Sequence, residues 1–233
     1  MRLEQNLPVL TMPGWPHACS YLPGREANTE FAFVRRLTPA AYEQFLNAGF
    51  RRSGQMIYRP ACGTCRECQP IRSLVNEFQP DRSMHRCWRA NQDLTTRVTR
   101  PRLTPEKTDL YRRYVTARHD KDDPSGPDDF LYASPVESRE IEFRRGDELL
   151  AVAIVDVVPA GLSAVYTYFS TDYPARGLGT FAVLWEIDYC RRLGKRLLYL
   201  GYYVRDCGKM NYKNRFRPYE ILGPDGAWHC GAE

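Results

Sequence analysis

Cys62, Cys65 and Cys68 are each separated by two residues, and Pro60 and Pro70 bracket them. Prolines on both sides favour a tight loop over a helix or strand, so the three thiols are expected to converge. Thiolates at this spacing hold iron–sulfur clusters or tetrahedral zinc. The first chemistry that the sequence indicates is therefore metal binding, and the alternative is a reduced loop held by ordinary packing.

A closed metal site takes four ligands, one more than this loop provides. Cys19 is the candidate for the fourth, because no histidine lies near enough in the sequence to complete a common zinc pattern. A zinc or iron–sulfur site and a metal-free loop both stay open. The remaining cysteines are interpreted as structural or incidental: Cys87, Cys190, Cys207 and Cys230.

Positive charge is concentrated in the segment 82–118. This segment contains nine arginines and one lysine against three acidic residues, whereas the whole chain has a net charge of +5. A helix predicted over 83–94 places Arg82, Arg86 and Arg89 on one face. Arginine forks match phosphate oxygens, so we expect this face to bind RNA, and a merely solvated helix face is the alternative.

Composition narrows the class of protein. The chain has 233 residues, 43% of them hydrophobic, and a mean hydropathy of −0.53. These values suit a water-soluble globule of one or two domains, and no apolar run approaches the roughly 20 residues that span a bilayer. The N-terminus lacks the order of a secretory signal, so a cytoplasmic protein with reduced cysteines is expected.

Local signals predict the elements that position these residues. Thr38-Pro39 begins a helix that Gly49 ends, and a hairpin turning near Gly54 leads to the cysteine loop. We expect an arm over 1–16 and a domain boundary near residue 101, which gives an α/β (α+β) chain with domains at 1–100 and 101–233. The other predicted elements are strands at 71–78, 94–100, 139–144, 149–158, 162–169 and 196–200, a helix from Thr104, a polar loop at 120–129, and a helix from a glycine turn at 176–180 to residue 192.

The order of strands, glycine turn, helix and strand in the second half resembles the GCN5-related N-acetyltransferase fold. In that superfamily the turn presents backbone N–H groups to the pyrophosphate of coenzyme A. The superfamily has Gln or Arg three residues before the first glycine, where this chain has Pro174. Proline has no N–H to donate, which argues against coenzyme A as the donor.

Motifs along nearly the whole sequence resemble the bacterial arginyl-tRNA-protein transferase family, and most closely its aspartate/glutamate leucyltransferase branch. The motifs are Cys19–Ala27, the cysteine loop through Arg72, Gly161–Phe169, Tyr199–Val204, Gly208–Lys213 and Phe216–Pro218. The resemblance implies transfer of an aminoacyl group from tRNA to the N-terminal amine of proteins beginning with Asp or Glu. The product is then marked for proteolysis.

The resemblance also bears on cofactors and partners. Aminoacyl-tRNA is the implied co-substrate, and the chemistry itself needs no cofactor, because the donor is already an activated ester. Eukaryotic relatives hold an iron–sulfur cluster through cysteines that are arranged differently from those here. Leucine is the implied aminoacyl group and arginine stays open, as does the oligomeric state.

With an activated donor, catalysis depends mainly on positioning the amine and stabilising the oxyanion. The four histidines are scattered in the sequence, and no nucleophile triad is expected. Each candidate below also has a structural alternative, such as packing aromatics, local ion pairs or a solvated helix face. The candidates are Arg25 and Arg72 for the acceptor carboxylate, Tyr202, Lys209, Tyr212 and Lys213 for tRNA, and Asp156, Tyr166 and Tyr168 for proton transfer.

Two other functions remain. The first is an acetyl-coenzyme A dependent N-acetyltransferase, which the fold alone would allow. The second is a non-enzymatic RNA-binding module with a zinc knuckle. This alternative assigns no function to the tyrosine-lined second half.

Overall fold

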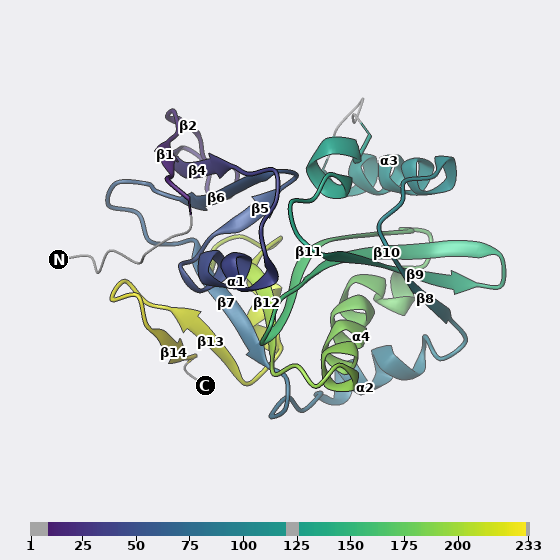
Figure 1. The fold of residues 1–233 in the computed structure, drawn as a ribbon. Coiled ribbons are helices and arrows are strands. Elements are labelled where there is room, and N and C mark those ends of the chain that lie inside the picture. Colours follow the sequence, from purple (N-terminus) through teal and green to yellow (C-terminus); the bar gives the residue numbers. More distant parts are fainter. Residues whose placement is uncertain (1–8, 120–125, 232–233) are drawn as a thin grey trace.

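An eight-stranded mixed sheet forms the centre of the protein (Figure 1). The structure is a computed structural model and describes residues 9–119 and 126–231, so the predicted arm and polar loop lie partly outside it. The strand order is β14-β13-β7-β12-β11-β10-β9-β8. The strands are β7 (Gln69–Leu74), β8 (Thr95–Thr99), β9 (Ser138–Arg145), β10 (Glu148–Val157), β11 (Gly161–Phe169), β12 (Leu197–Tyr203), β13 (Tyr219–Leu222) and β14 (Trp228–Cys230).

Helices cover both faces of the β8–β11 half of this sheet. In Figure 1, α3 (Pro105–His119) lies on one face, and α2 (Arg82–Arg89) and α4 (Leu178–Arg192) lie on the other. Strand β10 is enclosed between them, and its residues 149–156 are all buried. This double cover explains why β10 is a nearly continuous apolar run rather than an alternating one.

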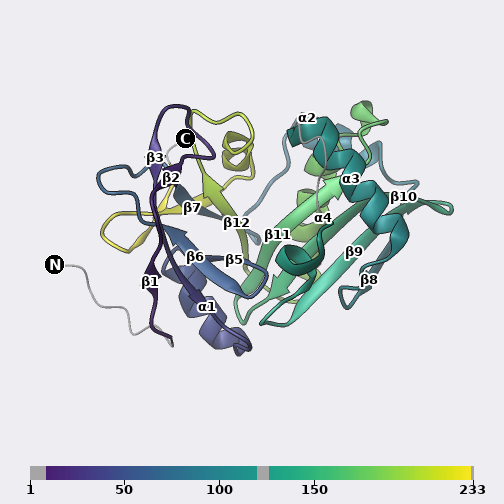
Figure 2. The ribbon, with the colours of Figure 1, turned by 90° about the horizontal axis from the view of Figure 1, so that it is seen from above.

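A smaller layer stands beside the large sheet (Figure 2). It contains a four-stranded sheet of order β1-β4-β6-β5 and the helix α1 (Pro39–Asn47), whose Tyr42 and Phe45 share a core with Leu197 and Tyr199 of β12. The two layers are therefore joined by a common apolar core. The strands of the smaller layer are β1 (Met12–Pro13), β4 (Thr29–Phe33), β5 (Arg51–Ser53) and β6 (Met56–Pro60). A separate two-stranded sheet pairs β2 (His17–Ala18) with β3 (Glu26–Ala27).

Most of the predicted elements are present. The Thr38 hydroxyl caps α1 by accepting a hydrogen bond from the Ala41 N–H at 3.2 Å, and Gly54 turns the hairpin. The helix predicted over 83–94 ends earlier, at Arg89. The short strands β1–β4, β13 and β14 were not predicted, because each has only two to five residues.

Strand β7 follows the cysteine loop, yet it pairs with β12 and β13 rather than with the small sheet. Strand β8 also belongs to the large sheet. The large sheet thus takes strands from both sides of residue 101. A domain boundary at that residue stays a prediction.

Candidate functional site

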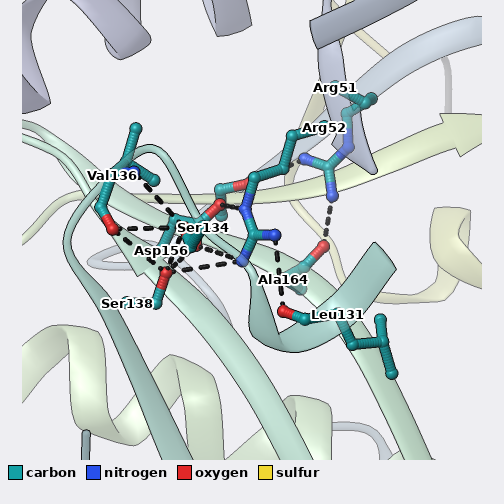
Figure 3. Close-up of polar contacts among 9 residues, drawn as sticks. Arg51, Arg52, Leu131, Ser134, Val136, Ser138, Asp156 and Ala164 are labelled. Carbon is teal, nitrogen blue, oxygen red and sulfur yellow. Dashed lines mark hydrogen bonds and ion pairs between the residues drawn. The ribbon is translucent and has the colours of Figure 1, made fainter. Parts of the chain in front are cut away.

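The two parallel strands at the middle of the large sheet separate along their length. Strands β11 and β12 pair only from Gly161 with Leu197 to Ser163 with Tyr199, although both strands continue beyond those residues. At the last pair and just beyond it, the guanidinium of Arg51 from β5 lies against β11. It donates a hydrogen bond to the Ser163 hydroxyl at 2.9 Å and another to the Ala164 carbonyl (Figure 3).

The same guanidinium reaches β12. Gly201 has a φ of +88°, and a Cβ placed on it would lie 3.4 Å from Nε of Arg51. A larger residue at this position would be strained and would press on the arginine. Arg51 therefore occupies the gap between the diverging strands, where it brings a positive charge from the small layer into the large sheet.

A buried lysine lies close to Arg51. Lys213 is in the 3-10 turn η3 (Asn211–Arg215), and its Nζ donates to the Tyr202 carbonyl on β12 at 2.7 Å. Only 7% of Lys213 is exposed, and it forms no ion pair within the described ranges 9–119 and 126–231. Burial, with the positive charge of Arg51 adding to it, lowers the pKa of Lys213 to about 7.

A buried carboxyl group lies on the α4 side of the same charge. Glu186 is fully buried, and neither of its carboxyl oxygens has a hydrogen-bond partner among the described residues. Burial raises the pKa of Glu186 to about 8, and the charge of Arg51 opposes this shift. The carboxyl is therefore protonated at neutral pH. Sequence reasoning did not single out Arg51 or Glu186.

Asp156, a predicted proton acceptor, is instead held in a buried ion pair (Figure 3). Its two oxygens accept from Nε and Nη2 of Arg52 at 2.7 and 2.8 Å, and Ser138 donates to one of them at 2.6 Å. The side chains of Arg52 and Asp156 are both 0% exposed. A carboxylate with both oxygens occupied in a buried ion pair is not available to accept a proton from a substrate amine. Asp156 instead links β10 to β5 through Arg52.

The two candidate tyrosines lie under α3. The Tyr168 hydroxyl is 2.7 Å from that of Tyr132, and the ring of Tyr166 packs against Tyr111 and Tyr114. Burial is the main cause that raises the pKa of both Tyr166 and Tyr168 above the ordinary value. Each hydroxyl therefore keeps its proton at neutral pH.

The four tRNA candidates outside α2 divide into two pairs. Tyr202 is 2% exposed, and its hydroxyl donates to the carbonyls of Gly49 and Tyr58. Tyr202 and Lys213 face inward, so neither lies on a surface where it could bind the phosphates of the tRNA. Lys209 and Tyr212 are exposed and stay candidates.

The predicted RNA-binding face on α2 is open to solvent. Arg82, Arg86 and Arg89 are all exposed, and none of them forms an ion pair within the described part of the chain. Arg215 of η3 donates to the Ser83 hydroxyl at 2.8 Å, which brings the η3 turn beside α2. The α2 arginines and the exposed side of η3 can thus contribute to one basic surface.

Replacing Arg82, Arg86 and Arg89 together by glutamine should weaken tRNA binding and flatten its salt dependence. Each lost phosphate contact changes the slope of log K against log salt by about 0.7–0.9. Titrations of tRNA at several salt concentrations measure this slope. The matched control replaces Arg112, Arg113 and Arg118 of α3, which removes equal charge from the opposite face of the sheet. Equal effects of the two sets would contradict an RNA site on α2.

The two acceptor candidates also differ. Arg72 is committed to an ion pair with Glu220 at 2.6 Å and stacks over Trp228, so it has little capacity to bind a further carboxylate. Arg25 is exposed and lines a pocket of about 450 Å³ together with Glu26. The rest of the lining is Pro16, His17, Ala18, Cys19 and Gly24.

The predicted metal ligands gather near one another but not around one centre. The pKa of Cys68 is raised to about 12 by burial and by the neighbouring Cys19, Cys62 and Cys65. The Cys62 thiol instead contacts the backbone of Asn28. Within residues 9–119 and 126–231, no three metal-binding side chains are grouped to hold an ion. The thiols in this arrangement do not fit a closed four-ligand site.

Comparison with known proteins decides the family. The model for "Arginine-tRNA-protein transferase, N terminus" matches residues 17–86, and the model for "Arginine-tRNA-protein transferase, C terminus" matches residues 106–223. The chain belongs to the arginine-tRNA-protein transferase family. Its motifs had predicted this membership, which is thereby confirmed.

Individual relatives of the family cover most of the chain. An aspartate/glutamate leucyltransferase of Pseudomonas savastanoi pv. phaseolicola is 43% identical over 213 residues, which are 89% of this chain and 91% of the relative. One of Marinobacter nauticus is 42% identical over 219 residues, 91% and 92% of the two chains. Among solved structures, "L-PGS from Bacillus licheniformis" aligns with a TM-score of 0.50 at 12% identity, covering 76% of this chain and 68% of that one. This last likeness concerns the fold alone. Among the described residues, every helix is too short or too polar to span a bilayer.

Proposed function

We propose that this protein transfers leucine from leucyl-tRNA to the N-terminal amine of proteins that begin with Asp or Glu. The observation that carries the proposal is the 43% identity, over 89% of the chain, to a relative named aspartate/glutamate leucyltransferase. The two family models support aminoacyl-tRNA as the donor. An arginyl donor is the alternative within the same chemistry.

The fold supports an acyl transfer between the diverging strands. The C-terminal half has the predicted order of strands, glycine turn, helix and strand, and β11 and β12 separate after three residue pairs. In this proposal the tRNA ester lies at the open end of the gap that Arg51 closes from the other side. A fixed positive charge there would stabilise the oxyanion that forms as the amine attacks.

Helix α2 supports a tRNA donor over coenzyme A. The carbonyls of Arg176 and Gly177, which begin the glycine turn, each lie 3.4 Å from the Cys87 thiol of α2. Asn91 also donates to the Arg176 carbonyl, at 2.8 Å. Helix α2 thus packs across the turn that would receive a pyrophosphate, while its own arginines face the solvent.

The acceptor chain brings one carboxylate and one ammonium to the enzyme. Arg25 offers a cation and Glu26 an anion on the lining of one pocket, and both residues are exposed. We assign this pocket to the N-terminal Asp or Glu of the acceptor. Arg72 then supports the large sheet through Glu220.

Incubation with charged tRNAs and short peptides tests the function. Mass spectrometry should find one added leucyl residue on peptides that begin with Asp or Glu, and none on a peptide that begins with Ala. Arginyl-tRNA and acetyl-coenzyme A serve as the competing donors. Acetylation of these peptides, with no product from leucyl-tRNA, would refute the proposal.

A further inference from the structure

Two basic side chains share one buried region, and neither forms an ion pair with any of the described residues. Lys213 reaches the carbonyl of Tyr202, and the next residue back along β12, Gly201, lies against Arg51. The guanidinium of Arg51 keeps its charge at any pH at which proteins are folded. Of two like charges held together away from water, the lysine is therefore the one that loses its proton.

The contacts of Lys213 suit a neutral amine. Its Nζ forms two hydrogen bonds within the described chain, to the Tyr202 carbonyl at 2.7 Å and the Met210 sulfur at 3.5 Å, and it also lies 5.9 Å from the centre of the Tyr212 ring. A neutral amine has two N–H donors and a lone pair, so these two contacts leave the lone pair available. The other titratable groups that face it are Tyr212 and the Cys207 and Cys68 thiols, and the two thiols act on its pKa less strongly than burial and Arg51 do.

We propose that Lys213 is the proton acceptor of the transfer reaction. This step rests on the proposed function. As the substrate nitrogen forms its bond to the ester carbonyl carbon, the nitrogen gives a proton to Nζ of Lys213. When the carbon–oxygen bond to the tRNA ribose breaks, the resulting ammonium returns that proton to the ribose oxygen. Protons and charge balance over the two steps, and no further reactant is needed.

The main test replaces Lys213 by arginine. K213R keeps a positive charge but cannot accept a proton, so kcat for leucyl transfer should fall by about 100-fold or more while the Kd for tRNA stays within a few-fold. In the wild type, kcat should rise with pH through a midpoint near 7, and K213R should lose this rise. The matched control is K195M, because Lys195 also donates to backbone carbonyls, those of Val158 and Pro159, at 2.6 and 3.2 Å. Its pH profile should match the wild type.

A second measurement does not depend on catalysis. The chain has five lysines, so protein labelled with ε-carbon-13 lysine gives five NMR signals that Lys→Arg variants assign. The Lys213 signal should titrate near pH 7, well below the ordinary range of a lysine side chain. The NMR titration reports the protonation of Lys213 in the wild-type protein, so it tests the inference even if K213R fails to fold.

Two outcomes would overturn the inference. In the first, a folded K213R transfers leucine with nearly wild-type kcat and a weakened tRNA affinity, which would make Lys213 a cation for RNA. In the second, the Lys213 signal titrates at the ordinary lysine value of 10.5 instead of near 7. A wild-type protein that makes no leucyl product at all would instead refute the proposed function.

Discussion

Replacing Asp156 by asparagine should lower the free energy of unfolding by about 3–5 kcal/mol, because it leaves a buried arginine without its counter-ion. Asp156 and Arg52 form a bidentate pair with both side chains 0% exposed. The pair joins β5 of the small layer to β10 of the large sheet. Urea denaturation of the wild type and of Asp156→Asn measures the difference.

A double substitution separates a structural from a catalytic role. Arg52→Met with Asp156→Leu replaces the ion pair by apolar groups, and such exchanges are often neutral or stabilising. We expect this variant to recover most of the lost stability and to transfer leucine at a rate within a few-fold of the wild type. A stable double variant with no activity would instead support Asp156 as a proton acceptor.

The elements that could be predicted from the sequence are those whose signals lie in residues next to one another in the chain. The Thr38 cap, the Gly54 turn and the run of apolar residues in β10 each act within a few residues, and each element formed where its signal lay. The placement of β7 could not be predicted in this way. Its partners β12 and β13 lie more than 100 residues later in the chain, so only the assembled core selects them.

The site was less predictable because motifs give residue types and not the side that each residue faces. Lys209 and Lys213 are equivalent in the sequence, yet one is exposed and the other is buried. Arg51 gave no local signal, since its partners Ser163 and Ala164 are more than 110 residues away. The sequence did contain a local signal that Glu186 is buried. It is a single acid four residues after Ala182 and four before Cys190, on the apolar stripe of its helix.

Replacing Glu186 by glutamine should make the protein more stable than the wild type as the pH rises. Burial raises the pKa of Glu186 from 4.5 to about 8, so between these values the folded state holds a proton that the unfolded state has released. The wild type therefore loses about 1.4 kcal/mol per pH unit from this group, and glutamine has no proton to lose. Between pH 5.5 and 7.5 the free energy of unfolding of Glu186→Gln, relative to the wild type, should increase by about 2 kcal/mol.

Urea denaturation across this pH range measures the change, and Asp188→Asn is the matched control. Asp188 lies two residues further along α4 in a partly exposed ion pair with Arg192 at 3.0 Å, so its removal shows whether losing any carboxylate from this helix has the same effect. Lys213 has the opposite trend, because its lowered pKa makes stability rise between about pH 7 and 10.5. Both proteins contain Lys213, so its contribution cancels in the comparison. A parallel pH dependence of Glu186→Gln and wild type would mean that Glu186 is ionised in the folded protein, with Arg51 as its counter-charge.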